Sequence, residues 1–393
     1  MTAFAVIALL LASACGPTPS AQQIPVAMVA PAQETISAPL ASPSPAEAIF
    51  VQETVLLKVP TIEVAPPAGA EALLWAASTA EGVDALTAIR FFDADLITLA
   101  ADRRVQVAAV HATAFRPFTP EATAQAPQVW QRLVDGDILV RHDIAHELGL
   151  ALGGTVHLAS GGTTVAVRVG AFASNGAPPI ADLIVPWDLG GSLGHIEVTK
   201  LLVAITDGAS SRKVQKAVIA ALGGGEAVER QLPVSQQAQL LAGSSAVRIE
   251  PFSYVDLGDG MITIMGSWVR DWIVNIELPR LGRVNVNRIM APQLLAAFDD
   301  LAAEGLLEQM DPGQFGGGWV PRHIDWNPAR PLSMHAWGLA IDFNTRDNAL
   351  GASPTMDPRM VAVFERWGFA WGGRWARPDG MHFELAKVVQ PRE

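Results

Sequence analysis

The chain has 393 residues, of which 50% are hydrophobic and 17% charged, so it is long enough for two domains and too apolar to be disordered throughout. Its formal net charge of −12 disfavours nucleic acid and anionic surfaces as partners, because little positive charge is available to neutralise phosphates. The single cysteine, Cys15, excludes an intrachain disulfide.

Residues 1–15 have the pattern of a lipoprotein-type signal peptide. The apolar run over 3–14 is shorter than the roughly 20 residues that span a bilayer, but it suits the core of a signal peptide. Ser13 and Ala14 before Cys15 resemble the lipobox of bacterial lipoproteins, in which the cysteine becomes the lipidated first residue. We therefore expect an extracytoplasmic protein, held at the membrane only by a lipid on Cys15 or secreted if it is not lipidated.

Residues 16–49 are expected to form a tether. They consist mainly of Pro, Ala, Ser, Gln and Thr with almost no charge. Such a composition cannot bury enough apolar surface to fold. A tether between a lipid anchor and a domain suits a target that lies some distance from the membrane.

Residues 50–255 are expected to form one mixed α+β domain. Two alternating runs joined by Ser160, Gly161 and Gly162 indicate a β-hairpin. The expected elements are strands over 50–64 interrupted at Pro60, helices within 70–89, 127–137 and 210–223, and the hairpin over 155–172.

The pattern over 138–172 is a short helix, a Gly-rich turn and a hairpin. This order resembles the extracytoplasmic domain of MacB/FtsX-type transporter permeases. The resemblance rests on pattern and includes no chemical motif, so the role of the 50–255 domain stays open.

The segment 141–152, RHDIAHELGLAL, is a first candidate for a metal site. His142 and His146 are four residues apart and would share one helical face, close to the H-E-x-x-H-x-x-G-x-x-H signature of metzincins. Asp143 replaces the general-base glutamate, and Leu152 stands where the third histidine belongs. We therefore favour an amphipathic helix with Leu152 among its core-facing residues.

The part over 268–388 is expected to be a second domain, after a boundary near 256–268. It contains strand-like residues 273–278, a helical pattern over 290–307 and a Gly-rich loop at 315–319. Its length is ordinary for a domain.

Two motifs in this second part point to a catalytic metal site. Ser333, His335 and Asp342 follow the order S-x-H-x-x-G-x-A-x-D, and Asp379 and His382 follow as D-x-x-H. Two histidines and one aspartate provide three protein ligands and leave the fourth position of a zinc ion for water, as in catalytic sites. Alternation along 339–343 directs Asp342 into a cleft and its neighbours into the core.

Asp379 is the candidate acid and base. It lies three residues before His382 and is not needed as a ligand. It is therefore placed to take a proton from the attacking water and hand it to the leaving amine. Glu384 is a candidate hydrogen-bond partner for a metal-bound histidine.

These motifs resemble the D-Ala-D-Ala carboxypeptidase family of zinc peptidases, the VanY/VanX type, which also includes phage L-alanyl-D-glutamate endopeptidases. The resemblance implies an antiparallel sheet with packed helices, and a peptidoglycan stem peptide cut next to a D-amino acid. It also implies an upstream arginine that contacts substrate or steadies the oxyanion, and Arg322 matches it better than Arg330. Ser333 corresponds to the motif serine, which would hold substrate or a neighbouring ligand.

Two other functions remain open. A non-catalytic cell-envelope binding or assembly lipoprotein would explain the long N-terminal part. A metzincin-like protease centred on His142 would require the metal to survive the loss of His335. The sequence leaves open which peptide bond is cleaved and the oligomeric state.

Overall fold

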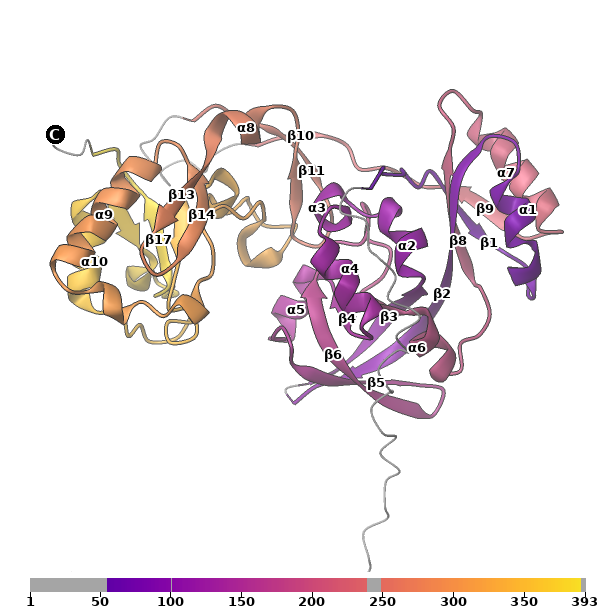
Figure 1. Ribbon diagram of the computed structural model, residues 1–393, viewed down its shortest axis with the longest axis horizontal. Helices are drawn as coiled ribbons and strands as arrows, with labels where there is room; N and C mark the ends of the chain where they lie inside the picture. The colour runs from indigo at the N-terminus through magenta and orange to yellow at the C-terminus, as the bar shows by residue number, and fades with distance from the viewer. Residues whose placement is uncertain (1–54, 100, 239–248, 390–393) are drawn as a thin grey trace, which may run out of the picture. The chain divides into compact units, whose positions relative to one another are not determined.

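A computed structural model describes residues 55–99, 101–238 and 249–389 (Figure 1). The expected signal peptide and tether lie outside the described residues. Helices occur together with several sheets, which confirms the mixed α+β class. Within the described ranges, no helix is both long enough and apolar enough to cross a bilayer. The division into two domains stays a prediction, and the N-terminal and C-terminal parts are described separately below.

The N-terminal part is built on one sheet with the strand order β3-β7-β4-β6-β5-β2-β8-β1-β9. The long strand β2 also pairs with β3, so that six of these strands close into a ring. Buried and more exposed residues alternate along much of β2, as expected for a strand with one face on a core. The strands are β1 (Ile62–Ala65), β2 (Val83–Ile97), β3 (Asp102–Val110), β4 (Ile138–Val140), β5 (Thr155–Ser160), β6 (Thr163–Phe172), β7 (Leu183–Pro186), β8 (Lys200–Ile205) and β9 (Glu226–Glu229).

Short helices accompany this sheet. Three clusters of buried apolar side chains lie among the helices and strands of this part. The helices are η2 (Ala70–Leu73), α1 (Leu74–Ser78), α2 (Ala112–Phe115), η3 (Arg116–Phe118), α3 (Glu121–Ala124), α4 (Pro127–Val134), α5 (His142–Glu147), α6 (Trp187–Ser192) and α7 (Ser211–Ala221).

Most of the elements expected in this part are confirmed. Strands β5 and β6 form the expected hairpin, with Gly161 and Gly162 at positive φ in its turn. Helices α4 and α7 lie within the expected helical stretches. The helix expected over 70–89 is wrong beyond Ser78, because Gly82 turns the chain at φ 81° and β2 begins at Val83.

Two further expectations need correction. Residues 55–61 are not in a strand, and only β1 forms within the expected 50–64 region that the structure describes. Helix α5 ends at Glu147, so Leu152 lies beyond it and is 62% exposed instead of facing the core.

The C-terminal part contains three small antiparallel sheets. The sheet that carries the motif residues has the order β15-β17-β16. The strands are β10 (Gln236–Gln237), β11 (Ser253–Asp256), β12 (Ile262–Ile264), β13 (Ile273–Leu278), β14 (Gly282–Asn287), β15 (Ala340–Asp342), β16 (Phe369–Trp371) and β17 (His382–Leu385). The helices are α8 (Trp268–Trp272), α9 (Ala291–Ala303), η4 (Leu307–Gln309), η5 (Pro312–Gln314), η6 (Ile324–Trp326), η7 (Met334–Trp337), α10 (Pro358–Arg366) and η8 (Gly372–Arg374).

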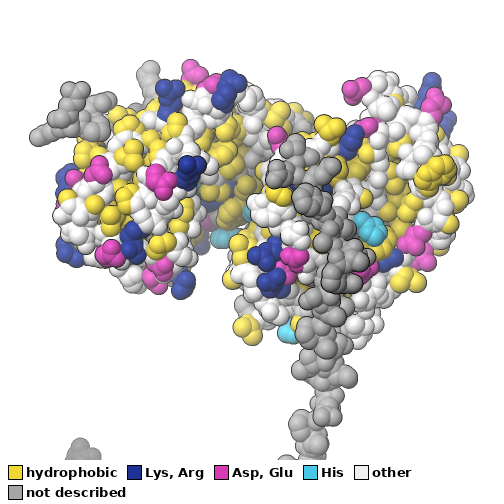
Figure 2. Space-filling view, viewed as in Figure 1, with side chains coloured by type: hydrophobic (Ala, Val, Ile, Leu, Met, Phe, Trp, Pro, Cys, Tyr) yellow, Lys and Arg dark blue, Asp and Glu magenta, His cyan; other side chains and the backbone are white. Residues whose placement is uncertain are grey.

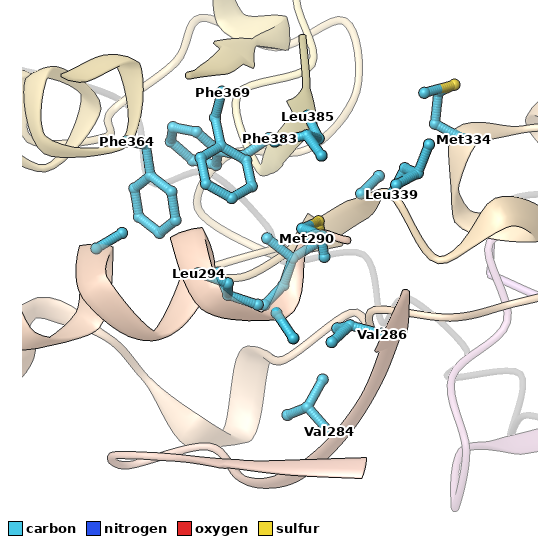
Figure 3. Packing of buried hydrophobic residues seen from close by; sticks show 14 of the residues in the cluster. Val284, Val286, Met290, Leu294, Met334, Leu339, Phe364, Phe369, Phe383 and Leu385 are labelled. Carbon is cyan, nitrogen blue, oxygen red and sulfur yellow. The ribbon is translucent and has the colours of Figure 1, made fainter. Parts of the chain in front are cut away.

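Aromatic packing fixes strand β17 in the core of this part (Figure 3). Phe383 stacks on Phe343 with ring centroids 5.1 Å apart, and it meets Phe364 of α10 at 4.4 Å. All three rings are fully buried, and each such ring contributes roughly 1.5–3 kcal/mol by leaving water. Since Phe383 adjoins His382, this packing also fixes the backbone that carries the histidine.

The same core includes residues before the expected domain start at 268. Phe252, Tyr254 and Ile262 are buried in the cluster formed by the C-terminal part. We therefore propose that the C-terminal domain begins upstream of β11, inside the region first assigned to the 50–255 domain.

Candidate metal centre

The three predicted ligands come from three elements of the C-terminal part and converge on one point. Within the described residues, His335, Asp342 and His382 form one group whose potential ligand atoms all lie within 4.8 Å of one another. Nε2 of His335 is 3.0 Å from Oδ2 of Asp342 and 3.2 Å from Nδ1 of His382. Nδ1 of His382 is 3.0 Å from Oδ1 of Asp342. All three side chains are buried.

Local structure explains this convergence. Asp342 ends β15 and His382 begins β17, and the two are register partners in the antiparallel pair. His335 lies in the single turn η7, and its backbone N–H donates to the Ser333 hydroxyl, the cap of this turn, at 3.3 Å. Gly338 ends the turn at φ 66°, where an added Cβ would lie 2.8 Å from the Asn287 nitrogen. Only glycine fits this position.

The Gly-rich loop over 315–319 packs against Asp342 and binds His335. An added Cβ on Gly316 would lie 2.7 Å from the Asp342 Cβ, so the close approach of this loop depends on glycine. The Gly318 carbonyl accepts a hydrogen bond from Nδ1 of His335 at 2.8 Å. The two motifs do not include Gly318, because its contribution is a backbone carbonyl.

Both imidazoles have their outer nitrogens engaged. With Nδ1 donating to Gly318, His335 presents the Nε2 lone pair to the common point. Nε2 of His382 is 3.2 Å from the Glu384 carboxylate, so its Nδ1 lone pair can face the same point. Metal-binding histidines are usually oriented in this way. The donor set and its orientation therefore fit a zinc ion held by His335, Asp342 and His382.

The charges of the site favour a cation at its centre. Burial would raise the pKa of Asp342, but the neighbouring imidazoles outweigh it and hold this pKa well below its usual range. Burial would lower the pKa of His382, but hydrogen bonds to Asp342 and Glu384 outweigh it and raise this pKa to about 10. Without metal, a proton on His382 thus compensates the two carboxylates, and a divalent cation could take over this task.

Asp379 lies in the loop before β17 and faces the same pocket. Burial raises its pKa to about 6, the Asp342 charge adds to the rise, and His382 and Arg322 oppose it. Its Oδ1 is buried and has no hydrogen-bond partner among the described residues. The loop is fixed by the backbone N–H of Asp379, which donates to the Gly372 carbonyl at 2.9 Å. A carboxylate with a free oxygen and this pKa can exchange a proton near neutral pH.

Arg322 also lines the pocket. One guanidinium nitrogen donates to the His323 carbonyl at 3.2 Å, and the group lies 5.1 Å from the Trp326 ring. Burial lowers its pKa, against the opposing charges of Asp342, Asp379 and Asp325. Arg330, the second arginine considered, pairs instead with Asp325 at the edge of this region.

The remaining predicted residues are placed as follows. Ser333 lines the pocket, and its hydroxyl accepts a hydrogen bond from the backbone N–H of His335, which suits the role of holding a neighbouring ligand. Trp375 lies over the site with its ring 5.2 Å from that of His382. The apolar walls of the pocket include Val320, Leu332, Met334, Leu350 and Met381.

The alternative site on α5 lacks a third ligand. His142 and His146 lie on one short helix, as the motif predicts. Among the residues that the structure describes, they belong to no group with metal-binding geometry.

Comparison with known families supports the C-terminal interpretation. Residues 326–385 match the family model described as D-alanyl-D-alanine carboxypeptidase. This range contains the three candidate ligands and Asp379, whereas Arg322 lies before it. The resemblance predicted from the motifs is confirmed, and the match supports a peptidase function for this part of the chain.

Comparison with solved structures gives likenesses to transporter domains. The extracellular domain of the noncanonical ABC-type transporter YknZ from Gram-positive bacteria is 14% identical, with a TM-score of 0.32, and the match covers 44% of this chain and 99% of that one. The periplasmic region of MacB from Actinobacillus actinomycetemcomitans is 12% identical, with a TM-score of 0.28, covering 44% and 89%. A putative permease domain from Porphyromonas gingivalis is 14% identical, with a TM-score of 0.29, covering 42% and 85%. The resemblance to permease domains is thus found again, but TM-scores this low assign no role to the N-terminal part.

No curated protein matches the chain. The functional description that these comparisons give is that of the carboxypeptidase family model, and it applies to residues 326–385.

Proposed function

We propose that this chain is a zinc-dependent peptidase that hydrolyses peptidoglycan stem peptides next to a D-amino acid. The observation that carries the proposal is the convergence of His335, Asp342 and His382 beside Asp379, inside a segment that matches the carboxypeptidase family. Two imidazoles and one carboxylate leave the fourth position of a tetrahedral ion open, which is the arrangement of catalytic zinc.

When bound, zinc would supply a Lewis acid that polarises the scissile carbonyl and makes water more acidic. The residues of the chain would do the rest. Asp379 accepts a proton from the attacking water and delivers it to the leaving amine, a task that suits a carboxyl with a pKa of about 6. Arg322, a half-buried cation on the same pocket, steadies the negative charge that develops on the carbonyl oxygen.

The surroundings of the site support these roles. His335 and His382 are held in one orientation by Gly318 and Glu384, so they need no rearrangement to bind metal. Apolar walls formed by residues such as Leu332 and Met381 limit the access of bulk water and strengthen the electrostatic interactions inside.

We further propose an extracytoplasmic location with a lipid anchor on Cys15, since peptidoglycan lies outside the cytoplasmic membrane. The N-terminal part would form a separate domain between the tether and the peptidase domain. The enzyme could act as a D,D-carboxypeptidase or as an L-Ala-D-Glu-type endopeptidase, since both activities use the same metal ligands. Which of them it has depends on whether the cleft is closed at one end.

The test is hydrolysis of defined stem peptides by the purified chain loaded with zinc, followed by mass spectrometry of the products. We expect either loss of the terminal D-alanine or cleavage after the first L-alanine, and neither product with His335→Ala. Binding of muropeptides without cleavage by a protein that holds one zinc would favour the alternative, a non-catalytic envelope-binding lipoprotein. Zinc retained by His335→Ala would favour the site on α5.

A further inference from the structure

A cluster of charged residues borders the pocket and is not used by the proposed chemistry. Asp325, in η6, lines the pocket, and its Oδ2 lies 3.1 Å from Nη1 of Arg377. Nη1 of Arg330 pairs with the same oxygen. The three residues come from two segments, the one that follows Arg322 and the loop that leads to Asp379.

The cluster has an excess of positive charge. Two guanidinium groups share a single carboxylate, and both remain largely exposed, at 44% for Arg330 and 63% for Arg377. Arg322 also lines the pocket, but it is faced there by Asp342 and Asp379, so the excess belongs to Arg330 and Arg377 alone. Such an excess is unexpected in a chain with a net charge of −12.

Several other arginines of the C-terminal part each pair with carboxylates of their own. Arg374 pairs with Glu365, and Arg366 bonds to two carboxylates, Asp300 and Glu304. Acidic and basic side chains are interspersed over the face seen in Figure 2. The cationic excess is therefore a feature of the pocket edge and not of this surface in general.

The backbone of Asp325 is also unusual. Asp325 and Trp326 both have φ 54°, a left-handed conformation that residues other than glycine seldom adopt. Such conformations persist only when their surroundings hold them. The two arginines provide part of that support through the Asp325 carboxylate. An anion that displaced this carboxylate from the arginines would therefore free the segment.

We propose that Arg330 and Arg377 form a subsite for a carboxylate of the stem peptide away from the scissile bond. In the free protein the Asp325 carboxylate occupies this position, and the substrate carboxylate replaces it. The inference rests on the proposed function for its choice of ligand. Guanidinium groups suit this task, because their planar donors match a carboxylate.

The chemistry identifies a specific substrate group. A stem peptide with a γ-linked D-glutamyl residue carries a free α-carboxylate inside the chain. Amidation of this carboxylate removes the charge while it leaves size and shape almost unchanged. The subsite would therefore distinguish stem peptides by their state of amidation.

The test is calorimetric binding of two pentapeptides to the full chain loaded with zinc. One is L-Ala-γ-D-Glu-L-Lys-D-Ala-D-Ala, and the other carries the α-carboxamide on D-Glu. Asp379→Asn serves as the background that prevents turnover. We expect the carboxylate form to bind about tenfold more tightly, in line with one charge-assisted hydrogen-bonded pair.

Three variants in this background locate the effect. Arg377→Gln should reduce the preference for the carboxylate form to less than about twofold, and Arg330→Gln should reduce it as well. Arg374→Gln is the matched control, since this exposed arginine lies in the same loop region but pairs with Glu365. It should retain the full preference.

Equal affinity of the parent protein for the two peptides would overturn the subsite, as would an equal loss in Arg374→Gln and Arg377→Gln. Circular dichroism and zinc content establish that each variant is folded. The proposed function is tested separately by hydrolysis with Asp379 intact. A carboxylate preference lost in Arg377→Gln, together with no hydrolysis by the zinc-loaded parent, would support the subsite and refute the peptidase.

Discussion

Asp342 and His382 face each other as register partners of β15 and β17, with Oδ1 of Asp342 3.0 Å from Nδ1 of His382. A strand pair thus holds two of the three candidate ligands at a fixed separation. Because the strands are anchored by Phe343 and Phe383 in the core, the separation does not depend on a bound ion. The site is therefore largely formed before metal binds.

We predict that metal binding releases a proton from His382. Hydrogen bonds to Asp342 and Glu384 outweigh burial and raise its pKa to about 10, so the imidazole is protonated at neutral pH without metal. Zinc needs the neutral ring, and its affinity should therefore rise with pH. Calorimetric titration with zinc at pH 7 in buffers of different ionisation enthalpy should show release of about one proton. No dependence on the buffer would contradict this protonation state.

The same shift predicts how the stability of the metal-free protein varies with pH. The pKa of His382 is raised from the unfolded value of 6.5 to about 10. The resulting stabilisation is fully present below pH 6.5 and is lost as the pH rises through about 10. The thermal midpoint of the protein after chelation should fall over this interval. His382→Gln should fall less, and an equally steep fall in this variant would assign the effect to other groups.

We predict that substitution of Asp379 abolishes catalysis but not metal binding. Asp379→Ala should keep zinc, because its carboxylate is outside the ligand group, and it should lose turnover by about 10²–10⁴-fold, the usual contribution of a general acid or base. His382→Ala should lose both. Zinc analysis and hydrolysis of stem peptides measure the two properties, and full turnover in Asp379→Ala would remove this residue from the mechanism.

The activity should have an acidic limb set by Asp379. Burial and the charge of Asp342 raise its pKa to about 6, and only the ionised form can accept a proton. Activity should therefore rise with pH up to this value, and a bound cation would move the limb to lower pH. Arg322 opposes the rise in pKa, so Arg322→Gln should shift the limb to higher pH as well as reduce the maximal rate. If the acidic limb of the pH–activity profile is unchanged in Arg322→Gln, Arg322 does not influence the pKa of Asp379.

The sequence predicted the candidate ligands more completely than their surroundings. His335, Asp342 and His382 lie in short motifs, where residue type and spacing already indicate the chemistry. The pair between Asp325 and Arg377 spans 52 residues and depends on how two loops meet, so no local pattern indicates it. The Gly318 carbonyl is likewise invisible to an argument from side chains.

In the fold, too, features set by local sequence were predicted better than features set by contacts between distant residues. The hairpin at 155–172 was predictable, because two glycines in its turn supply the required positive φ. The Ala-rich stretch over 70–89 favours a helix by local propensity, yet from Val83 onward it pairs with β8 and, from Ile89, with β3. Long-range pairing outweighs propensity there. Leu152 was misplaced for a related reason, since the helix stops earlier than its apolar pattern suggests.

Glu384 offers a test of how strongly a hydrogen bond to a candidate ligand affects the zinc affinity of the site. Its carboxylate is 3.2 Å from Nε2 of His382, and it is the neighbour that fixes which nitrogen of that ring faces the ligand group. Glu384→Gln removes the charge but keeps the length, and the amide can still accept the hydrogen bond. Zinc affinity should therefore fall by about 10–100-fold in Glu384→Ala and less in Glu384→Gln. Competition with a chelator of known affinity measures both. Glu365→Ala, which removes a partly exposed carboxylate paired with Arg374, is the control. Equal affinities in Glu384→Ala and the control would show that the core packing of β17 alone orients His382.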